Sequence, residues 1–544
     1  MKKSISLAYF ILFITATFFA QHDQQVDSLI HNYYEGDKPG IALAIIKDGQ
    51  TIYNNETGLA NLEYNIPISD STSFLIASVS KQFTAYLALL LEQERKLKMT
   101  DDVRNHLPEL KDLPYKFTLE QLANHTHGLP NISELVNVKG FGISDRMWHR
   151  GMVDMALRIK TFNFQPGEDY QYNNTGFLLL AEIIERVAEM PFQAALKEYI
   201  FNPLAMENSM AVPDPNLIIK NKSESYTLTN NGYQRYEGNI MSNGSAGIRT
   251  TIKDLAKWAK HFQATAKNSD SPFMRMIEKS QLNSGEQLPY GLGLETKAYK
   301  GLQAVFHGGG TAGHRAYTLH IPAHNFSVMV LGNGKDYWPL KIAYQVVDLY
   351  LNEFQTEPAA IQDKITATKP LTDLAGTYEF SPGNYYVFTT ENDSLFLGSL
   401  GSSDKMLLPQ LSGNTFEFPF YPEARFVFQA GRADLYIADF IYRCAPVNPI
   451  LKKYATVALQ KFTGFYHSES LNTTYEILVE NDQLIARHPI NYDIPLIGLK
   501  DDSFYSQYNF FGKIDFVKNI ENEVTGFKLS GQNMVGLNFQ KIGL

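Results

Sequence analysis

Cysteine is almost absent from this chain of 544 residues, which contains Cys444 alone. A single cysteine excludes an intramolecular disulfide, a cysteine-based zinc site and an iron–sulfur cluster. Cys444 stands at the end of a strand-like run, where we expect a small buried apolar side chain; the alternative is a reactive thiol.

Long basic runs are missing as well. The chain has 48 Lys and Arg against 57 Asp and Glu, a net charge of −9. It lacks the positive surface of a nucleic-acid binder, so we expect no nucleic-acid partner. Apolar residues make up 44% and charged residues 19%, which is typical of globular proteins. The length predicts two to four domains.

The first twenty residues have the pattern of a secretory signal peptide. Lys2 and Lys3 precede an apolar stretch over 7–14, and Ala20 is a small residue before a polar segment. Phe18 would occupy the −3 position and is not small, so the cleavage site is open by a few residues. No nearby cysteine could carry a lipid, and no later stretch approaches a membrane span. We predict a signal peptide over 1–20 and an exported, periplasmic or extracellular chain; the alternative is an uncleaved N-terminal anchor.

Residues 21–355 mix strand and helix patterns. A β-rich run, 41–47, is followed by the hairpin turn Asp48–Gly49 and a returning strand. A second hairpin is predicted over 316–331, and a helix over 338–353 has Pro339 in its first turn. Strands at both ends with helices between them predict an α/β (α+β) domain, in which helices flank one antiparallel sheet.

The C-terminal part has an all-β pattern and repeats. After a predicted linker, 356–370, Leu371 and Tyr378 recur 88 residues later as Leu459 and Tyr466, and other landmarks keep an offset of 88 or 89. We interpret this as a tandem duplication. Each unit, 371–450 and 459–544, is predicted to form a small antiparallel barrel or sandwich.

Ser78 and Lys81 form an S-x-x-K motif at the start of a helical pattern. One turn of helix places both side chains on the same side, and a serine hydroxyl becomes a good nucleophile when a neighbouring base takes its proton. The alternative is a helix cap beside a solvated lysine. The motif alone is weak, because Ser402 and Lys405 repeat it inside the β region.

Two further segments offer polar groups to a cleft. Tyr172 and Asn174 lie on a loop that enters an apolar helix, and a tyrosine can act as a base when positive charges lower its pKa; the alternative is a core tyrosine beside a helix cap. His307 opens the segment His-Gly-Gly-Gly, where glycines let a substrate backbone approach a strand edge. A plain tight turn is the alternative there.

Metal and cofactor signals are weak. His125 and His127 could form a metal pair, but no third ligand stands at a suitable spacing. The glycines after His307 match a dinucleotide-binding pattern, yet a strand follows them instead of a helix. We therefore expect no metal and no organic cofactor.

The three motifs occur in an order that resembles the penicillin-recognising serine hydrolases, in particular the class C β-lactamase and D-aminopeptidase branch with its D-alanyl-D-alanine carboxypeptidase relatives. The resemblance covers about residues 25–355. It extends to the segments 74–85, 122–130, 202–206, 250–255 and 290–293.

The resemblance implies a role for each motif. Ser78 would be the nucleophile, with Lys81 and Tyr172 sharing the role of the base. The backbone N–H groups of Ser78 and Gly310 would form the oxyanion hole. Asn174, His307, Gly308 and Gly309 would bind the substrate.

Two residues depart from the family pattern, and one of them limits the activity that we expect. His307 replaces the lysine of efficient β-lactamases, so we expect slow or no turnover of β-lactams. His127 replaces a serine, and the sequence offers no reason.

The resemblance implies hydrolysis of an amide or ester, with a small D-amino-acid-containing peptide, a peptidoglycan fragment or an ester as the partner. The alternatives are a carboxylesterase of the same family and a ligand-binding or sensing protein without turnover. The doubled β unit resembles the two C-terminal barrels of the D-aminopeptidase type, and lipocalin-like barrels of this kind also bind small ligands.

Overall fold

The computed structural model describes residues 22–31, 34, 36–212, 214, 216–239, 242–356, 370–418, 424–429, 431–437 and 440–543. The predicted signal peptide and nearly all of the predicted linker lie outside this set. By its internal contacts the chain divides into two units. The first comprises residues 1–127, 143–154 and 166–359, and the second comprises 128–142, 155–165 and 360–544. The sequence did not indicate that two short internal segments group with the C-terminal part.

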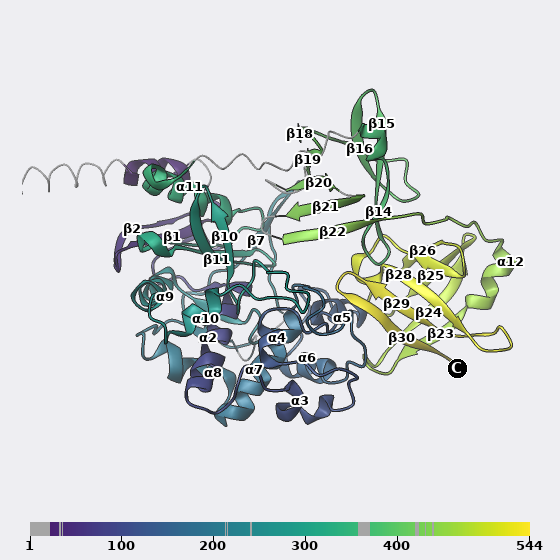
Figure 1. Cartoon of the computed structure of the whole chain (residues 1–544), viewed down its shortest axis with the longest axis horizontal. Coiled ribbons are helices and arrows are strands. Elements are labelled where there is room, and N and C mark those ends of the chain that lie inside the picture. Colours follow the sequence, from purple (N-terminus) through teal and green to yellow (C-terminus); the bar gives the residue numbers. More distant parts are fainter. Residues whose placement is uncertain are drawn as a thin grey trace, which may run out of the picture. The chain divides into compact units, whose positions relative to one another are not determined.

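The first unit is built on a six-stranded antiparallel sheet whose strands come from both ends of the unit (Figure 1). Their order is β10-β11-β12-β13-β1-β2, so the first strand pairs with the last, with Ile41 opposite Gly332. Asp48 and Gly49 both have positive φ, as a tight hairpin turn requires. The predicted single sheet is confirmed. The strands are β1 (Ile41–Lys47), β2 (Gln50–Thr57), β10 (Glu295–Tyr299), β11 (Leu302–Thr311), β12 (His314–Ile321) and β13 (Phe326–Gly332).

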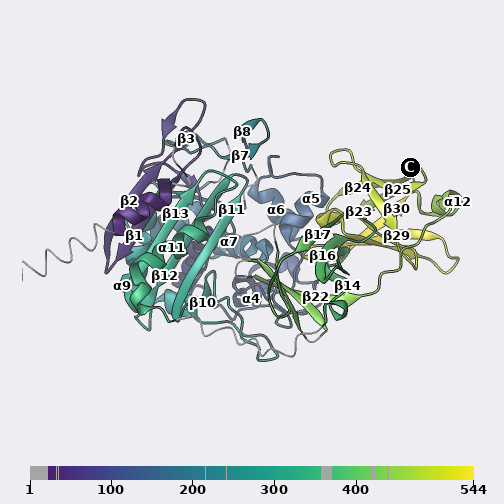
Figure 2. The same cartoon turned by 90° about the horizontal axis from the view of Figure 1, so that it is seen from above.

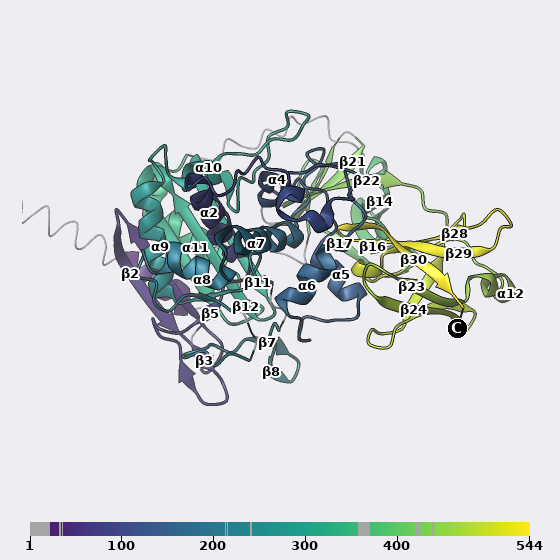
Figure 3. The ribbon, with the colours of Figure 1, turned by 90° about the horizontal axis from the view of Figure 1, so that it is seen from below.

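Helices cover both faces of this sheet. On one face α11 (Pro339–Leu351) and a helix over residues 22–31 share a buried core with alternate strand residues such as Leu43 and Val330 (Figure 2). The opposite side carries most of the remaining helices of the unit (Figure 3). The other helices that begin in this unit are α2 (Ser80–Gln93), α3 (Val103–His106), α4 (Leu119–Ala123), α6 (His149–Ala156), α7 (Asn174–Ala188), α8 (Phe192–Leu196), α9 (Ile252–Thr265) and α10 (Pro272–Ile277).

Helix α2 is buried on nearly every side. Its residues from Ser80 to Leu89, and Leu91, are all buried, including Lys81 and Gln82. The polar side chains tolerate burial because they find partners. Gln82 accepts a hydrogen bond from Trp258 Nε1 at 2.6 Å and donates one to Thr318 Oγ1 at 3.2 Å.

Short strands complete the first unit. They form a two-stranded pair of β3 (Leu59–Asn61) and β4 (Ile66–Pro67), a three-stranded sheet of β5 (Phe74–Leu75), β9 (Ile248–Thr250) and β6 (Met210–Ala211), and a hairpin of β7 (Tyr226–Thr229) and β8 (Gly232–Arg235). Strand β5 ends one residue before the turn that carries Ser78, so this small sheet positions the start of α2.

Two antiparallel meanders form most of the second unit. The first is a nine-stranded sheet in the order β17-β16-β15-β14-β22-β21-β20-β19-β18, whose two edge strands are separated in sequence only by Pro409. The second is a closed eight-stranded barrel. This confirms the two predicted barrel-like regions. The strands are β14 (Gly376–Ser381), β15 (Asn384–Glu391), β16 (Ser394–Ser399), β17 (Lys405–Leu408), β18 (Gln410–Ser412), β19 (Thr415–Glu417), β20 (Arg425–Gln429), β21 (Arg432–Ile437), β22 (Phe440–Val447), β23 (Gly464–Ser468), β24 (Thr473–Glu480), β25 (Gln483–Arg487), β26 (Ile494–Gly498), β27 (Ser503–Tyr505), β28 (Lys513–Lys518), β29 (Val524–Gly531) and β30 (Met534–Ile542), with the short helix α12 (Thr456–Leu459) before the second barrel.

The two meanders share a specific hydrogen bond, as a duplication predicts. Tyr378 donates from its hydroxyl to Leu374 O at 3.3 Å, and Tyr466 donates to Phe462 O at 2.6 Å. Both tyrosines are buried, and each therefore ties the first strand of its meander to the turn before it. Cys444 is buried in the first meander, as predicted, and burial raises the pKa of its thiol to about 12.

The two internal segments of the second unit are held by the eight-stranded barrel. Helix α5 (Ile132–Val138) ends at Val138, whose carbonyl accepts a hydrogen bond from Tyr475 Oη at 2.9 Å. Asn131 N–H donates to Asn533 O at 2.8 Å, and Asn163 Nδ2 donates to the same oxygen at 3.0 Å. Across the described part of the chain, no helix has both the length and the apolar character needed to cross a membrane.

Candidate active site

Ser78 is the one partly exposed residue between Thr72 and Leu89. It lies in a 3-10 turn, Ala77–Val79, that leads directly into α2. Ala77 has a φ of +47°, which is costly for a residue with a Cβ atom. The packing around this turn therefore holds a strained backbone, a condition that is common where a reactive side chain is presented to a ligand.

The Lys81 amine contacts three separate parts of the chain, which are the serine turn, the start of α7 and the loop at Ser245. Its Nζ lies 3.1 Å from Ser78 Oγ, 2.8 Å from Asn174 Oδ1 and 3.1 Å from Ser245 O. The side chain is fully buried, and this burial holds the pKa of the amine well below its usual value of 10.5; the charge of Glu295 opposes part of that shift.

The three partners of Lys81 suit either charge state of the amine. Asn174 Oδ1 and Ser245 O can only accept, so they take two of the lysine N–H groups. Ser78 Oγ can accept from a charged amine or donate to the lone pair of a neutral one. Burial favours the neutral form, and the contact with Ser78 is short enough for that form to receive the serine proton.

Tyr172 and Asn174 enter from the loop before α7. Asn173 caps this helix by accepting the Thr175 N–H at 2.7 Å, which fixes the residues on either side of it. The Lys81 Nζ lies 4.7 Å from the centre of the Tyr172 ring, so the predicted lysine and tyrosine are neighbours. The structure therefore brings together all three residues predicted to carry the chemistry.

The glycine segment of β11 lies against the serine turn. A Cβ atom on Gly309 would come within 2.2 Å of Ile76 O and 3.2 Å of Ser78 N, so only glycine allows this approach. Strand β10 pairs with β11 only as far as Phe306, and residues 307–311 pair with β12 alone among the described ladders. Gly310 is exposed at this edge, which places its backbone where a substrate could reach it.

His307 is buried and engaged at both ring nitrogens. Its Nδ1 donates to Gly308 O at 2.6 Å, and Tyr290 Oη donates to its Nε2 at 2.9 Å. Burial lowers the pKa of His307 to about 3, with Lys81 adding to the effect. Contact between His307 and a substrate remains a prediction. Tyr290 was not identified as a site residue from the sequence, although it opens the segment Tyr-Gly-Leu-Gly.

Two further histidines pack against the loop and the helix that carry Tyr172 and Asn174. His125 Nδ1 accepts the Asn173 N–H at 3.2 Å, and its ring lies 4.4 Å from the Tyr172 ring, so His125 fixes the tyrosine loop. His127 lies under the first turn of α7, because a Cβ on Gly176 would be only 2.9 Å from its Nε2. Burial lowers the pKa of both histidines. The glycine at 176 gives the larger side chain at 127 its space.

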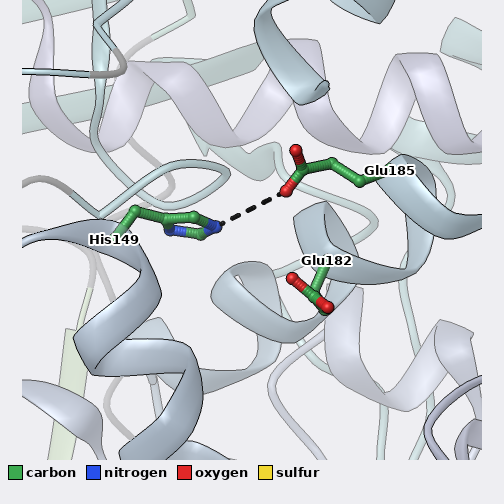
Figure 4. A group of neighbouring side chains, drawn as sticks. All are labelled: His149, Glu182 and Glu185. Carbon is green, nitrogen blue, oxygen red and sulfur yellow. Dashed lines mark ion pairs between the residues drawn. The ribbon is translucent and has the colours of Figure 1, made fainter. Parts of the chain in front are cut away.

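In the described part of the chain, three neighbouring side chains carry atoms of the kinds that bind metal ions. His149 on α6 points toward Glu185 on α7, and Glu182 lies one turn earlier on that helix (Figure 4). The His149 Nε2 lies 3.9 Å from Glu185 Oε2. Glu182, however, is already paired with Arg186 at 2.9 Å and Arg150 at 3.5 Å. These cations would repel a metal ion, so we assign this group to an ion-pair network.

Comparison with known proteins gives consistent results for the first unit. Residues 22–351 match the family model described as Beta-lactamase. D-aminopeptidase from Gluconobacter oxydans (strain 621H) is 31% identical over 301 residues, which are 54% of this chain and 56% of that protein. Protein flp from Staphylococcus aureus (strain MW2) is 27% identical over 327 residues, 57% of this chain and 63% of that protein. The match thus spans less than two thirds of these relatives.

Solved structures share the fold. The octameric penicillin-binding protein homologue from Pyrococcus abyssi has a TM-score of 0.54 at 22% identity, covering 80% of this chain and 99% of that one. FmtA from Staphylococcus aureus has a TM-score of 0.52 at 18% identity, covering 63% of this chain and 92% of that one. The resemblance to penicillin-recognising serine hydrolases is confirmed at the level of the family. The Beta-lactamase model covers more than half of the chain and includes the sheet, the serine turn and the glycine edge described above, so the chain belongs to the Beta-lactamase family.

Proposed function

We propose that this protein is a serine hydrolase that forms an acyl-enzyme on Ser78. The observation that carries the proposal is the position of Lys81, whose buried Nζ lies 3.1 Å from Ser78 Oγ and whose other two partners are carbonyl oxygens. Burial shifts this lysine toward its neutral form, which can take the serine proton.

Acylation then follows from the groups in place. The Ser78 Oγ–H proton passes to Lys81 Nζ as Oγ attacks the carbonyl carbon of an amide or ester. The backbone N–H groups of Ser78 and Gly310 donate to the resulting oxyanion. The proton on Lys81 passes to the departing nitrogen or oxygen, directly or through Tyr172, and the carbon–heteroatom bond breaks.

Deacylation reverses this proton path. A water molecule attacks the acyl carbon, and Lys81 or Tyr172 removes its proton. The bond to Ser78 Oγ breaks, the proton returns to that oxygen, and the carboxylic acid product leaves. Asn174 supports both halves of the reaction, because its Oδ1 holds Lys81 and its amide N–H₂ group is the candidate partner of a substrate carbonyl.

The substrate class we propose is a small peptide that contains D-amino acids, including peptidoglycan fragments, with weak or no hydrolysis of β-lactams. The D-aminopeptidase relatives support this class, as does the neutral His307 at the position of the β-lactamase lysine. We also propose that the chain is exported after cleavage near Ala20. N-terminal sequencing of the protein recovered from the periplasm or medium tests this, and an intact Met1 would contradict it.

Intact-mass spectrometry with a fluorescent penicillin tests the acyl-enzyme. We expect an adduct on wild-type protein that maps to Ser78 and is absent from Ser78→Ala. Ser402→Ala is the matched control. Ser402 opens the second S-x-x-K sequence, but it lies outside any helix and its Oγ accepts the Asp404 N–H. An adduct that survives in Ser78→Ala would refute the assignment.

Turnover assays separate the alternatives. We expect hydrolysis of D-aminoacyl amides and slower hydrolysis of acetyl esters. The reverse order would favour a carboxylesterase. A stable adduct without turnover of any amide or ester would favour a ligand-binding or sensing protein.

A further inference from the structure

A cavity of about 300 Å³ lies between the two meanders of the second unit. Its walls come from the end of β14 and the start of β15, from the end of β16, and from the end of β27 with the loop after it. Its volume is at the lower end of the range for small-molecule sites, about 300–1,000 Å³. The cavity is therefore large enough for one small ligand, and every residue that lines it belongs to the second unit.

Direct contacts between the meanders fix the walls of this cavity. Tyr505 Oη, from the second meander, donates to Leu400 O of the first at 2.5 Å. The Tyr505 ring also lies edge-on to the Tyr385 ring, with the ring centres 5.5 Å apart. A Cβ atom on Gly383 would come within 2.3 Å of the Gly512 carbonyl carbon, so the two backbones are in contact there. The cavity is thus formed in advance of a ligand, which reduces the cost of binding.

Four aromatic side chains line the cavity. Tyr505 is buried, and Phe380, Tyr385 and Tyr386 are half-buried, so the latter three keep part of their surface accessible. The Phe380 and Tyr386 rings lie 5.5 Å apart and form a second aromatic pair beside the pair of Tyr385 and Tyr505. Rings of this kind offer a rigid apolar surface to a ligand at little cost in side-chain entropy.

No charged side chain is among the residues that line the cavity. The two carboxylates that act on the Tyr385 hydroxyl are engaged elsewhere. Glu379 accepts the Gly383 N–H at 3.1 Å, and Asp515 forms an ion pair with Lys513 at 3.0 Å. A charged ligand would lose hydration in this cavity without gaining an ion pair, so the walls favour a neutral one.

The polar groups of the walls are amides and hydroxyls. The side chains of Ser399, Gln507 and Asn509 are exposed, and they make no hydrogen bond within the described part of the chain. An amide offers two donors and one acceptor, and a hydroxyl both donates and accepts. The hydroxyl groups of a sugar need donors and acceptors together, whereas the C–H groups on the faces of its ring are apolar and can pack against aromatic rings. The combination of groups in these walls therefore matches a sugar ring.

The duplication shows that one of the aromatic rings is not required for the strand to form. Tyr386 and Tyr475 are equivalent, because each is paired with the buried tyrosine on the first strand of its meander. One residue earlier, the first meander has Tyr385 and the second has Thr474. A meander of this type thus forms with a small side chain at this position, and the tyrosine at 385 is available for binding.

We propose that this cavity binds one neutral sugar ring of a glycan, with the ring packed against the aromatic side chains and its hydroxyl groups bound by Ser399, Gln507 and Asn509. This goes beyond the proposed hydrolysis, because it gives the second unit a binding role that does not depend on Ser78. The cavity contains no nucleophile paired with a base, so the glycan is held there and not cleaved.

Titration calorimetry with the full chain tests this proposal. The neutral probes are the trimer of N-acetylglucosamine and the trimer of glucose, and the charged probes are the trimer of galacturonic acid and the protonated trimer of glucosamine. We expect at least one neutral trimer to bind with a Kd of about 1 mM or below, and both charged trimers to bind at least about tenfold more weakly. The stronger of the two neutral ligands shows whether N-acetyl groups are recognised.

Two variants locate the binding in the cavity. Gln507→Ala, at an exposed side chain, should weaken binding about threefold to tenfold through lost hydrogen bonds. Tyr385→Thr, which introduces the residue of the second meander, should weaken it about tenfold through the lost aromatic contact. Tyr492→Ala is the matched control, because Tyr492 is 82% exposed and does not line the cavity, so affinity should not change.

The outcomes that overturn the proposal are distinct from those that test Ser78. Thermal unfolding first shows that each variant is folded. No binding of either neutral trimer overturns the proposal, as does a charged trimer that binds as tightly as the neutral ones. Unchanged affinity in both Gln507→Ala and Tyr385→Thr also overturns it. Penicillin labelling of Ser78 is expected to be the same in both variants as in wild type, since neither change touches the candidate active site.

Discussion

Replacing Lys81 with methionine tests the central step of the mechanism. Methionine has a similar length and fills the same buried space, but it has no group that can accept a proton. General-base catalysis contributes about 10²–10⁴ in rate, which corresponds to about 2.7–5.5 kcal/mol of activation free energy. We therefore expect acylation of Lys81→Met to be slower by about that factor.

The effect on stability should be smaller. The change leaves Asn174 Oδ1 and Ser245 O without their amine partner, and each lost partner costs about 1–3 kcal/mol where water cannot replace it. Asn174 is partly exposed, so water can reach it. The change also removes the cost of burying an amine. The net loss should be no more than about 1–3 kcal/mol.

Stopped-flow acylation by a fluorescent penicillin, with thermal unfolding measured in parallel, separates these effects. Lys405→Met is the control, because Lys405 belongs to the second S-x-x-K sequence and pairs with Glu391 at the surface. If folded Lys81→Met acylates within tenfold of wild type, Lys81 is not the base. In that case Tyr172 would be the base, and Tyr172→Phe would be expected to show the slower acylation instead.

Three other outcomes are expected. First, the acylation rate should rise with pH as Lys81 loses its proton at its lowered pKa. The free energy of unfolding should also rise with pH between that lowered pKa and 10.5, because the unfolded chain binds one more proton there. A pH-independent acylation rate and a pH-independent free energy from urea titrations would contradict this. Gly309→Ala should reduce acylation at least about tenfold and cost about 1–3 kcal/mol of stability, because the new methyl group overlaps Ile76 O; normal labelling would refute the close approach. Tyr466→Phe should destabilise the eight-stranded barrel by about 1 kcal/mol in denaturant unfolding, whereas Tyr492→Phe, at an 82% exposed side chain, should not; equal effects would show that the buried hydrogen bond contributes nothing.

Much of the fold could be predicted from local patterns. The positive-φ turn at Asp48–Gly49, the hairpin before α11 and the proline at its start are short-range signals that act through backbone geometry. The repeat of 88 or 89 residues was visible because turn residues and buried aromatic side chains must keep their register in an antiparallel meander.

The sequence could predict the site residues that act through their side chains. It could not predict the residues that act through backbone atoms. Ser78, Lys81 and Tyr172 are reactive residue types at recognisable spacings. Ser245 binds Lys81 through its carbonyl oxygen, and any residue at that position has the same atom. No sequence signal could identify it.

Partners that are distant in sequence were also missed. Tyr290 donates to His307 from another segment, and Gly176 makes room for His127. Each pair is a matter of packing between elements, which a single sequence does not reveal. The grouping of residues 128–142 with the C-terminal unit is of the same kind, because backbone carbonyls such as that of Val138 make the contacts.

The pairing of the first strand with the last one has a consequence for the order of folding. Strand β1 lies between β2 and β13, and Ile41 meets Gly332 only after nearly three hundred residues have been synthesised. Until then β1 has only its hairpin partner, and a two-stranded hairpin is marginally stable at best. Closing so long a loop is slow, and contacts of this range form late. The part of the growing chain that emerges before Gly332 is synthesised therefore has no closed central sheet, and its β1–β2 hairpin waits for a partner.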